Sequence, residues 1–176
     1  MRFKQINIHA KSYRFLFILL LFLTFSIPLY AQDKATIIRV VDGDTLKVEH
    51  QGQKATIKLI GIDAPESKFS RKAEQDAKRN SESLITITSM GIDATNYTKS
   101  LIKKGDTVTI EFDIQIKDKY NKLLGYIYLS DGRMLNEEIL MAGYAYLTTD
   151  SVNVKYQDRF LKAYNEAREN RRGLWK

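Results

Sequence analysis

Apolar and polar positions alternate in three short segments along the first half of the chain, separated by turns that contain glycine. Residues 35–41 form a β-branched segment, residues 45–49 alternate in the same way, and residues 55–62 repeat the rhythm. A period of two is typical of strands with one buried face, and Asp-Gly and Gln-Gly sequences suit tight turns. The pattern predicts a three-stranded meander, in which Gly61 marks a bulge or a close backbone approach.

The second half of the chain mixes helical and strand periods. Residues 70–83 are rich in charged side chains and predict either a solvated helix or a loop. A helix is expected over 93–104, with Asp93 as its N-cap and Gly105 after its end. Two further strands and two further helices are expected over 107–116, 123–129, 134–142 and 154–171.

Three strands, a helix, two strands and a helical tail are the element order of a five-stranded OB barrel. The sequence therefore predicts an α+β fold, mainly β, with about three helices, formed by residues 32–176 as one domain. A compact barrel of this size is expected to be a monomer.

The first thirty-one residues differ from the rest in composition. They begin with four basic and no acidic residues, and an almost unbroken apolar segment follows over 15–27. This segment is shorter than the roughly 20 residues that cross a membrane. The pattern predicts a signal peptide over 1–31, cleaved after Ala31, with an uncleaved anchor as the alternative. We expect an exported protein, periplasmic or extracellular, without stable membrane association after cleavage.

The predicted signal segment changes what the charge indicates. The whole chain has 28 basic and 21 acidic residues and a net charge of +7, but without the four basic residues of this segment the net charge is +3. That charge is compatible with a nucleic-acid ligand and does not by itself predict one. The absence of cysteine excludes disulfides, thiolate metal sites and a lipid anchor through cysteine.

Three carboxylates follow the ends of predicted strands: Asp44 after the first, and Asp63 and Glu66 after the third. If these two strands are neighbours in the barrel, the carboxylates meet at one mouth. Hard oxygen ligands suit Ca²⁺ or Mg²⁺ and argue against zinc. His50, the one histidine outside the signal segment, lies in a predicted turn, so a carboxylate must be the general base and Glu66 is the candidate. Taken alone, each of these motifs is also typical of a turn or loop.

Several separated motifs, in order, resemble the staphylococcal nuclease family. Residues 35–45 (ATIIRVVDGDT) resemble its opening strand and metal turn, and residues 58–66 (KLIGIDAPE) resemble its third strand and catalytic loop. Residues 118–128 (DKYNKLLGYIY) resemble its second phosphate-binding segment. Residues 143–146 (GYAY) and 171–175 (RRGLW) resemble its two closing signatures. The stretch from about 70 to 90 has no clear counterpart in the family.

The resemblance implies an OB fold and a Ca²⁺-dependent hydrolysis of phosphodiesters in DNA or RNA, by in-line attack of water on phosphorus. On this reading Asp44 and Asp63 bind Ca²⁺ through their side chains, and Ala64 binds it through the backbone carbonyl. Glu66 holds the attacking water, as general base or positioning group.

Lys58 and Lys122 stand where the family has two arginines that clamp the phosphate, and Lys119 and Tyr120 match positions that line its nucleotide pocket. Lysine is a hydrated point charge, whereas arginine is a planar fork that grips two oxygens. Losing one well-placed donor to transition-state charge costs about 10²–10³ in rate. The alternative hypothesis is therefore a weak or inactive module that binds nucleic acid or another anionic ligand, and the third is a purely structural domain.

Overall fold

The computed structural model describes residues 33–148 and 152–176. The chain separates into two units, 1–31 and 32–176, and the predicted signal peptide lies outside the described residues, so its cleavage stays a prediction. Among the residues described, no helix is long and apolar enough to cross a membrane.

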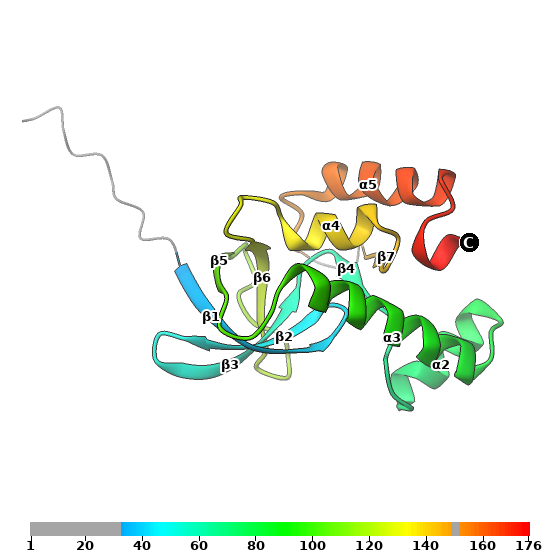
Figure 1. Ribbon diagram of the computed structural model, residues 1–176, viewed down its shortest axis with the longest axis horizontal. Coiled ribbons are helices and arrows are strands. Elements are labelled where there is room, and N and C mark those ends of the chain that lie inside the picture. Colours follow the sequence, from blue (N-terminus) through cyan, green and yellow to red (C-terminus); the bar gives the residue numbers. More distant parts are fainter. Residues whose placement is uncertain (1–32, 149–151) are drawn as a thin grey trace, which may run out of the picture. The chain divides into compact units, whose positions relative to one another are not determined.

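Five strands close into a barrel in the order β1-β2-β3-β6-β5, which confirms the predicted OB barrel (Figure 1). Neighbouring strands are antiparallel except β3 and β6, which run parallel. The side chains of Leu46, Val48 and Ile57 alternate along their strands into the interior and are fully buried. The strands are β1 (Asp33–Asp42), β2 (Thr45–His50), β3 (Gln53–Leu59), β5 (Thr107–Glu111) and β6 (Leu123–Tyr128).

The first and third strands are not neighbours, because β2 lies between β1 and β3, so the condition given for the convergence of the carboxylates does not hold. The carboxylates converge for a different reason. Asp44 belongs to the turn between β1 and β2, and the next residue, Thr45, pairs with Lys58 near the end of β3. The tight hairpin therefore brings the β1–β2 turn beside the residues that leave β3.

The third strand is shorter than the pattern indicates and ends at Leu59. Gly61, with φ of +78°, turns the chain into β4 (Ile62–Asp63), which pairs with β7 (Tyr146–Leu147) in a separate two-stranded sheet. A Cβ atom at Gly61 would lie 2.7 Å from the ring of Phe160, so the predicted close backbone approach is confirmed. This turn places Asp63 outside the barrel wall, where it can face the β1–β2 turn.

The strand expected over 107–116 also ends early, at Glu111. Tyr128 and Tyr156 each donate a hydrogen bond to Glu111 Oε2 at 2.9 Å, and Tyr126 donates to Asp113 Oδ2 at 3.0 Å. These bonds direct the chain toward the segment before the last helix. Of the apolar residues that extended the pattern beyond Glu111, Phe112 is partly buried against the core, while Ile114 and Ile116 are exposed.

The described part of the chain has four α-helices outside the barrel; α3 and α4 contact its strands, and α2 packs on α3 (Figure 1). The two expected near the C-terminus are confirmed, with ends that differ by three residues or fewer. The open question over 70–83 is settled in favour of a helix, whose N-cap Ser70 accepts a hydrogen bond from Ala73 N at 3.1 Å. The helices are α2 (Arg71–Asn80), α3 (Leu84–Leu101), α4 (Leu135–Met141) and α5 (Gln157–Glu169), followed by the 3₁₀ turn η1 (Gly173–Trp175).

The predicted start of a helix at Asp93 is wrong. α3 begins at Leu84 after the N-cap Ser83, whose hydroxyl accepts a hydrogen bond from Thr86 N at 3.0 Å. The first turns contain β-branched residues, which disfavour an isolated helix. They are helical here because Ile87 is fully buried against Ala73 and Ala77 of α2. Packing between α2 and α3 thus overrides local propensity, and Figure 1 shows the two helices side by side.

Candidate active site

Asp44 is the most buried of the three predicted site carboxylates, with 3% of its surface exposed. Its Oδ2 atom accepts hydrogen bonds from Ala64 N and from the Lys58 ammonium, both at 2.9 Å, and Thr45 donates to Oδ1 at 2.8 Å. Burial raises the pKa of Asp44, but the charge of Lys58 and these hydrogen bonds outweigh it, so the pKa lies below its ordinary value. Asp44 is therefore a charged group fixed from two sides.

Lys58 joins the two aspartates across the mouth. Its Nζ atom lies 2.9 Å from Asp44 Oδ2 and 3.3 Å from Asp63 Oδ1. Burial lowers the pKa of Lys58, but the charges of Asp44 and Asp63 raise it more, so the ammonium is held in its charged form. The structure thus brings together Asp44, Lys58, Asp63 and Ala64, and their roles toward a metal or a phosphate stay predictions.

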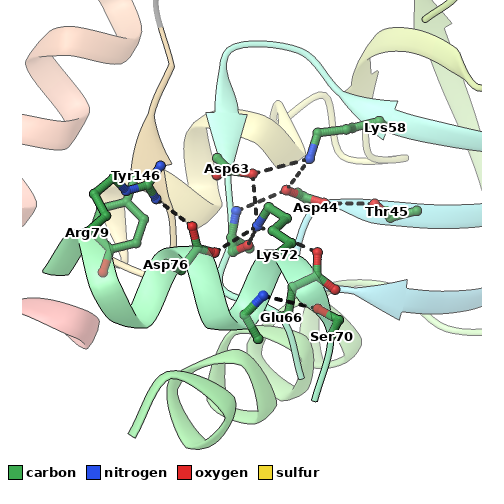
Figure 2. Close-up of polar contacts among 12 residues, drawn as sticks. Asp44, Thr45, Lys58, Asp63, Glu66, Ser70, Lys72, Asp76, Arg79 and Tyr146 are labelled. Carbon is green, nitrogen blue, oxygen red and sulfur yellow. Dashed lines mark hydrogen bonds and ion pairs between the residues drawn. The ribbon is translucent and has the colours of Figure 1, made fainter. Parts of the chain in front are cut away.

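Lys72, on α2, is a site residue that the sequence analysis did not identify (Figure 2). Its Nζ atom donates to Ala64 O at 3.1 Å and lies 3.3 Å from Asp63 Oδ1 and 3.5 Å from Glu66 Oε1. It also pairs with Asp76 one turn along α2, at 3.2 Å. Burial lowers the pKa of Lys72, but these surrounding carboxylates, Asp63 first, raise it above its ordinary value.

Glu66 is half-buried beside this cluster, and its only ion pair among the described residues is the one with Lys72. Burial raises its pKa, Lys72 lowers it, and Asp42 and Asp44 raise it again, with a net result above the ordinary value. The loop that carries Glu66 is tied to the barrel by Ser67, whose hydroxyl donates to Asp42 Oδ1 at 2.8 Å. A carboxylate with a raised pKa at a fixed position suits a general base.

The backbone of this loop rests directly on α3 at Gly91. A Cβ atom there would lie 2.2 Å from the carbonyl oxygen of Glu66 and 2.6 Å from Ser67 N. No side chain fits at this position, so α3 determines where the Glu66 loop lies. Nothing in the sequence pattern singles out this glycine, because a glycine within a helix has many possible roles.

We expect Gly91→Ala to destabilise the fold by about 1–3 kcal/mol, because the added methyl overpacks the contact. It should also lower the rate of any reaction that needs Glu66 in place, since a displacement of about 1 Å can cost roughly 10²-fold. Thermal unfolding and activity would be compared with Ser89→Ala, an exposed position of the same helix. Wild-type stability and rate in Gly91→Ala would contradict this account of the contact.

The carboxylate and carbonyl oxygens of this site are ligands that suit a divalent cation, although in this structure they contact lysine ammonium groups. Within 33–148 and 152–176, no three acidic, histidine or cysteine side chains are grouped so that they could hold a metal ion. The Lys72 ammonium nevertheless acts as a stand-in cation, because one atom reaches Asp63 Oδ1, Ala64 O and Glu66 Oε1 within 3.5 Å. Carboxylate and carbonyl oxygens are the ligands that Ca²⁺ and Mg²⁺ prefer.

Of the predicted phosphate-binding and nucleotide-binding residues, Lys58 lies in β3, whereas Lys119, Tyr120 and Lys122 lie in the turn before β6. In the parallel register Lys58 pairs with Leu124, and Lys122 directly precedes β6, two residues before this partner. Tyr120 is 70% exposed, with the ammonium of Lys119 above its ring at 5.1 Å. No hydrogen bond or ion pair joins the side chains of Lys119, Tyr120 and Lys122 to the carboxylates in the described part of the chain.

A groove of about 620 Å³ follows this side of the barrel next to that turn. Three lysines and an aromatic ring line it: Lys47, Lys54, Lys117 and Phe112. His50 is at its edge and forms a hydrogen bond of 2.6 Å with Asp33. Because His50 and Thr45 are at opposite ends of β2, the histidine is roughly 16 Å from the carboxylate site, as expected for a residue with no part in it.

Comparison with known proteins finds several similar proteins that are named as nucleases. The family model of staphylococcal nuclease homologues matches residues 56–176. The thermonuclease of Staphylococcus hyicus is 31% identical over 139 residues, which cover 79% of this chain and 73% of the relative. Endonuclease YncB of Bacillus subtilis is 34% identical over 142 residues, 80% of this chain and 60% of the relative. An uncharacterized endonuclease of Escherichia coli O157:H7 is 35% identical over 164 residues, 90% of this chain and 88% of the relative.

The family model spans Lys58, Asp63 and Glu66 as well as α2, and the barrel has the strand order that the resemblance implies. The segment matched is more than half of the chain, and the relatives align over most of the described residues. The chain belongs to the family of staphylococcal nuclease homologues.

Proposed function

We propose that this protein is an exported, Ca²⁺-dependent nuclease that hydrolyses phosphodiester bonds of DNA, RNA or both. The observation that carries the proposal is the meeting of Asp44, Asp63, the Ala64 carbonyl and Glu66 at one mouth of the barrel. The names of the relatives, thermonuclease and endonuclease, favour hydrolysis over a module that only binds. Export is supported by the basic and apolar pattern of residues 1–31.

The residues divide the work of an in-line displacement by water. Glu66, with its raised pKa and its fixed loop, would orient the attacking water and accept its proton. Lys58 of β3 and Lys122, directly before the neighbouring strand β6, would contact the non-bridging oxygens of the phosphate. Bound Ca²⁺, held by Asp44, Asp63 and the Ala64 carbonyl, would supply positive charge to the phosphoryl group.

The neighbouring surface supports a polymeric nucleic acid as the substrate. The groove beside the turn that carries Lys122 contains three lysines, which suit a phosphate backbone. The exposed ring of Tyr120, in that same turn, suits stacking on a base without preference for sequence. These features do not separate DNA from RNA, so both belong in the first experiment.

The test is cleavage of denatured DNA and of RNA by the purified protein, with excess Ca²⁺ or with a chelator. We expect products only with Ca²⁺, because the metal supplies charge that two lysines without arginine geometry do not replace. Recovery of the active protein from outside the cytoplasm would test export. If folded protein with Ca²⁺ cleaved neither substrate, the proposed function would be contradicted.

A further inference from the structure

We infer that Lys72 is a built-in cation that competes with Ca²⁺ for the carboxylate site and thereby sets the affinity of the protein for the metal. The inference rests on the proposed function, because it takes the same oxygens as the metal ligands. It concerns a residue of α2, a helix in the stretch for which the sequence motifs gave no clear family counterpart, although the family model spans it.

The contacts of Lys72 differ from those of Lys58. Lys58 reaches the two aspartates only, from the barrel side. Lys72 enters from α2 and contacts Asp63, Glu66 and the Ala64 carbonyl with one atom (Figure 2). A backbone carbonyl and two carboxylates around a single positive charge form a cation site, and here the cation is part of the chain.

α2 is fixed firmly enough to hold this ammonium in place. Ala73 and Ala77 are buried against Ile87 of α3, and Ser70 caps the first turn. At the other end of the helix, the side chain of Asn80 donates a hydrogen bond to Tyr146 Oη at 3.3 Å. The position of Lys72 follows from a packed helix, unlike that of a lysine on a free loop.

Lys72 retains an ion-pair partner, Asp76, when a metal displaces it from the carboxylate site. Asp76 lies one turn along α2, 3.2 Å from Lys72 Nζ, and its other oxygen is 2.8 Å from Arg79. A displaced Lys72 can keep its pair with Asp76, so exchange of ammonium for Ca²⁺ leaves no buried charge alone. The competition is therefore reversible and costs affinity without blocking the site.

The experiment measures Ca²⁺ affinity by titration calorimetry in the purified protein, with Lys72→Met, Lys72→Arg and the matched control Lys78→Met. Lys78 is exposed on the same helix. We expect Lys72→Met to bind Ca²⁺ about tenfold tighter or more, because a positive charge within a few ångströms of the metal is removed. Lys72→Arg, which keeps the charge, and Lys78→Met should stay near wild type.

A second measurement needs no variant to fold. In isotope-labelled wild-type protein, the side-chain NMR signals of Lys72 should shift as Ca²⁺ is added, while those of Lys78 should not. Unchanged Lys72 signals during saturable Ca²⁺ binding would overturn the inference, as would equal or weaker Ca²⁺ affinity in Lys72→Met. If cleavage still required Ca²⁺ after either of these results, the proposed nuclease function would hold and only the role of Lys72 would be wrong. If neither the wild type nor any variant bound Ca²⁺ or cleaved nucleic acid, both the role of Lys72 and the nuclease function would be wrong.

Discussion

Glu66→Gln is expected to lower the rate of phosphodiester cleavage by about 10²- to 10⁴-fold, the usual contribution of a general base. Glutamine has nearly the same shape and removes only the charge and the ability to accept a proton. Since Glu66 has one ion pair, with Lys72 at 3.5 Å, the fold should survive the change. Steady-state cleavage at saturating Ca²⁺ and substrate, beside thermal unfolding, separates the two effects.

The matched control for Glu66→Gln is Glu74→Gln, an exposed carboxylate on α2. Both variants lose one negative charge, so a general change in attraction of nucleic acid would lower both rates alike. A fall confined to Glu66→Gln supports the role of the base. Equal rates in Glu66→Gln and wild type would mean that another group activates the water, and the chemistry assigned to this loop would be wrong.

The carboxylates of the site could be predicted because each follows directly from a strand end. Asp44 lies in a turn, Asp63 ends the short strand β4 and Glu66 lies in the loop after it, and the glycine and proline beside them mark these boundaries in the sequence. Their convergence depends on the β1–β2 turn and on the turn at Gly61, and it does not require the first and third strands to be neighbours. Errors of strand order matter less when the residues lie in turns at the same end of the barrel.

Lys72 and Gly91 could not be predicted, because their roles depend on how α2 and α3 pack. A lysine four residues before Asp76 is typical of any solvated helix, and the pair gives no sign that the ammonium also reaches a carbonyl on a distant loop. The β-branched residues at the start of α3 concealed its first turns, and with them the contact of Gly91 with Glu66. Both facts arise from tertiary contacts between segments that the pattern treats separately.

Lys58 and Lys72 compensate the carboxylate charges of the site, so the stability of the protein depends on these ammonium groups. Asp44 is almost fully buried, and without a metal its charge is compensated by Lys58 and by backbone and hydroxyl donors. A buried carboxylate left without its partner typically costs 3–5 kcal/mol, roughly, and about 29% of the Lys58 side chain is exposed, which lowers that figure. The stability of the metal-free protein should therefore depend on Lys58.

We expect Lys58→Met to lower the free energy of unfolding by about 2–3 kcal/mol in chelator, a fall in Tm of roughly 5–10 °C. Excess Ca²⁺ should raise the Tm of this variant more than that of wild type, because the metal then replaces the missing charge and has only the Lys72 ammonium to displace, not that of Lys58 as well. Lys54→Met, exposed on the same strand, should behave as wild type in both conditions. A variant as stable as wild type in chelator would show that Asp44 does not need Lys58. A loss of stability that Ca²⁺ leaves unchanged would mean that Asp44 does not bind the metal, which would contradict the assignment on which the proposed nuclease depends.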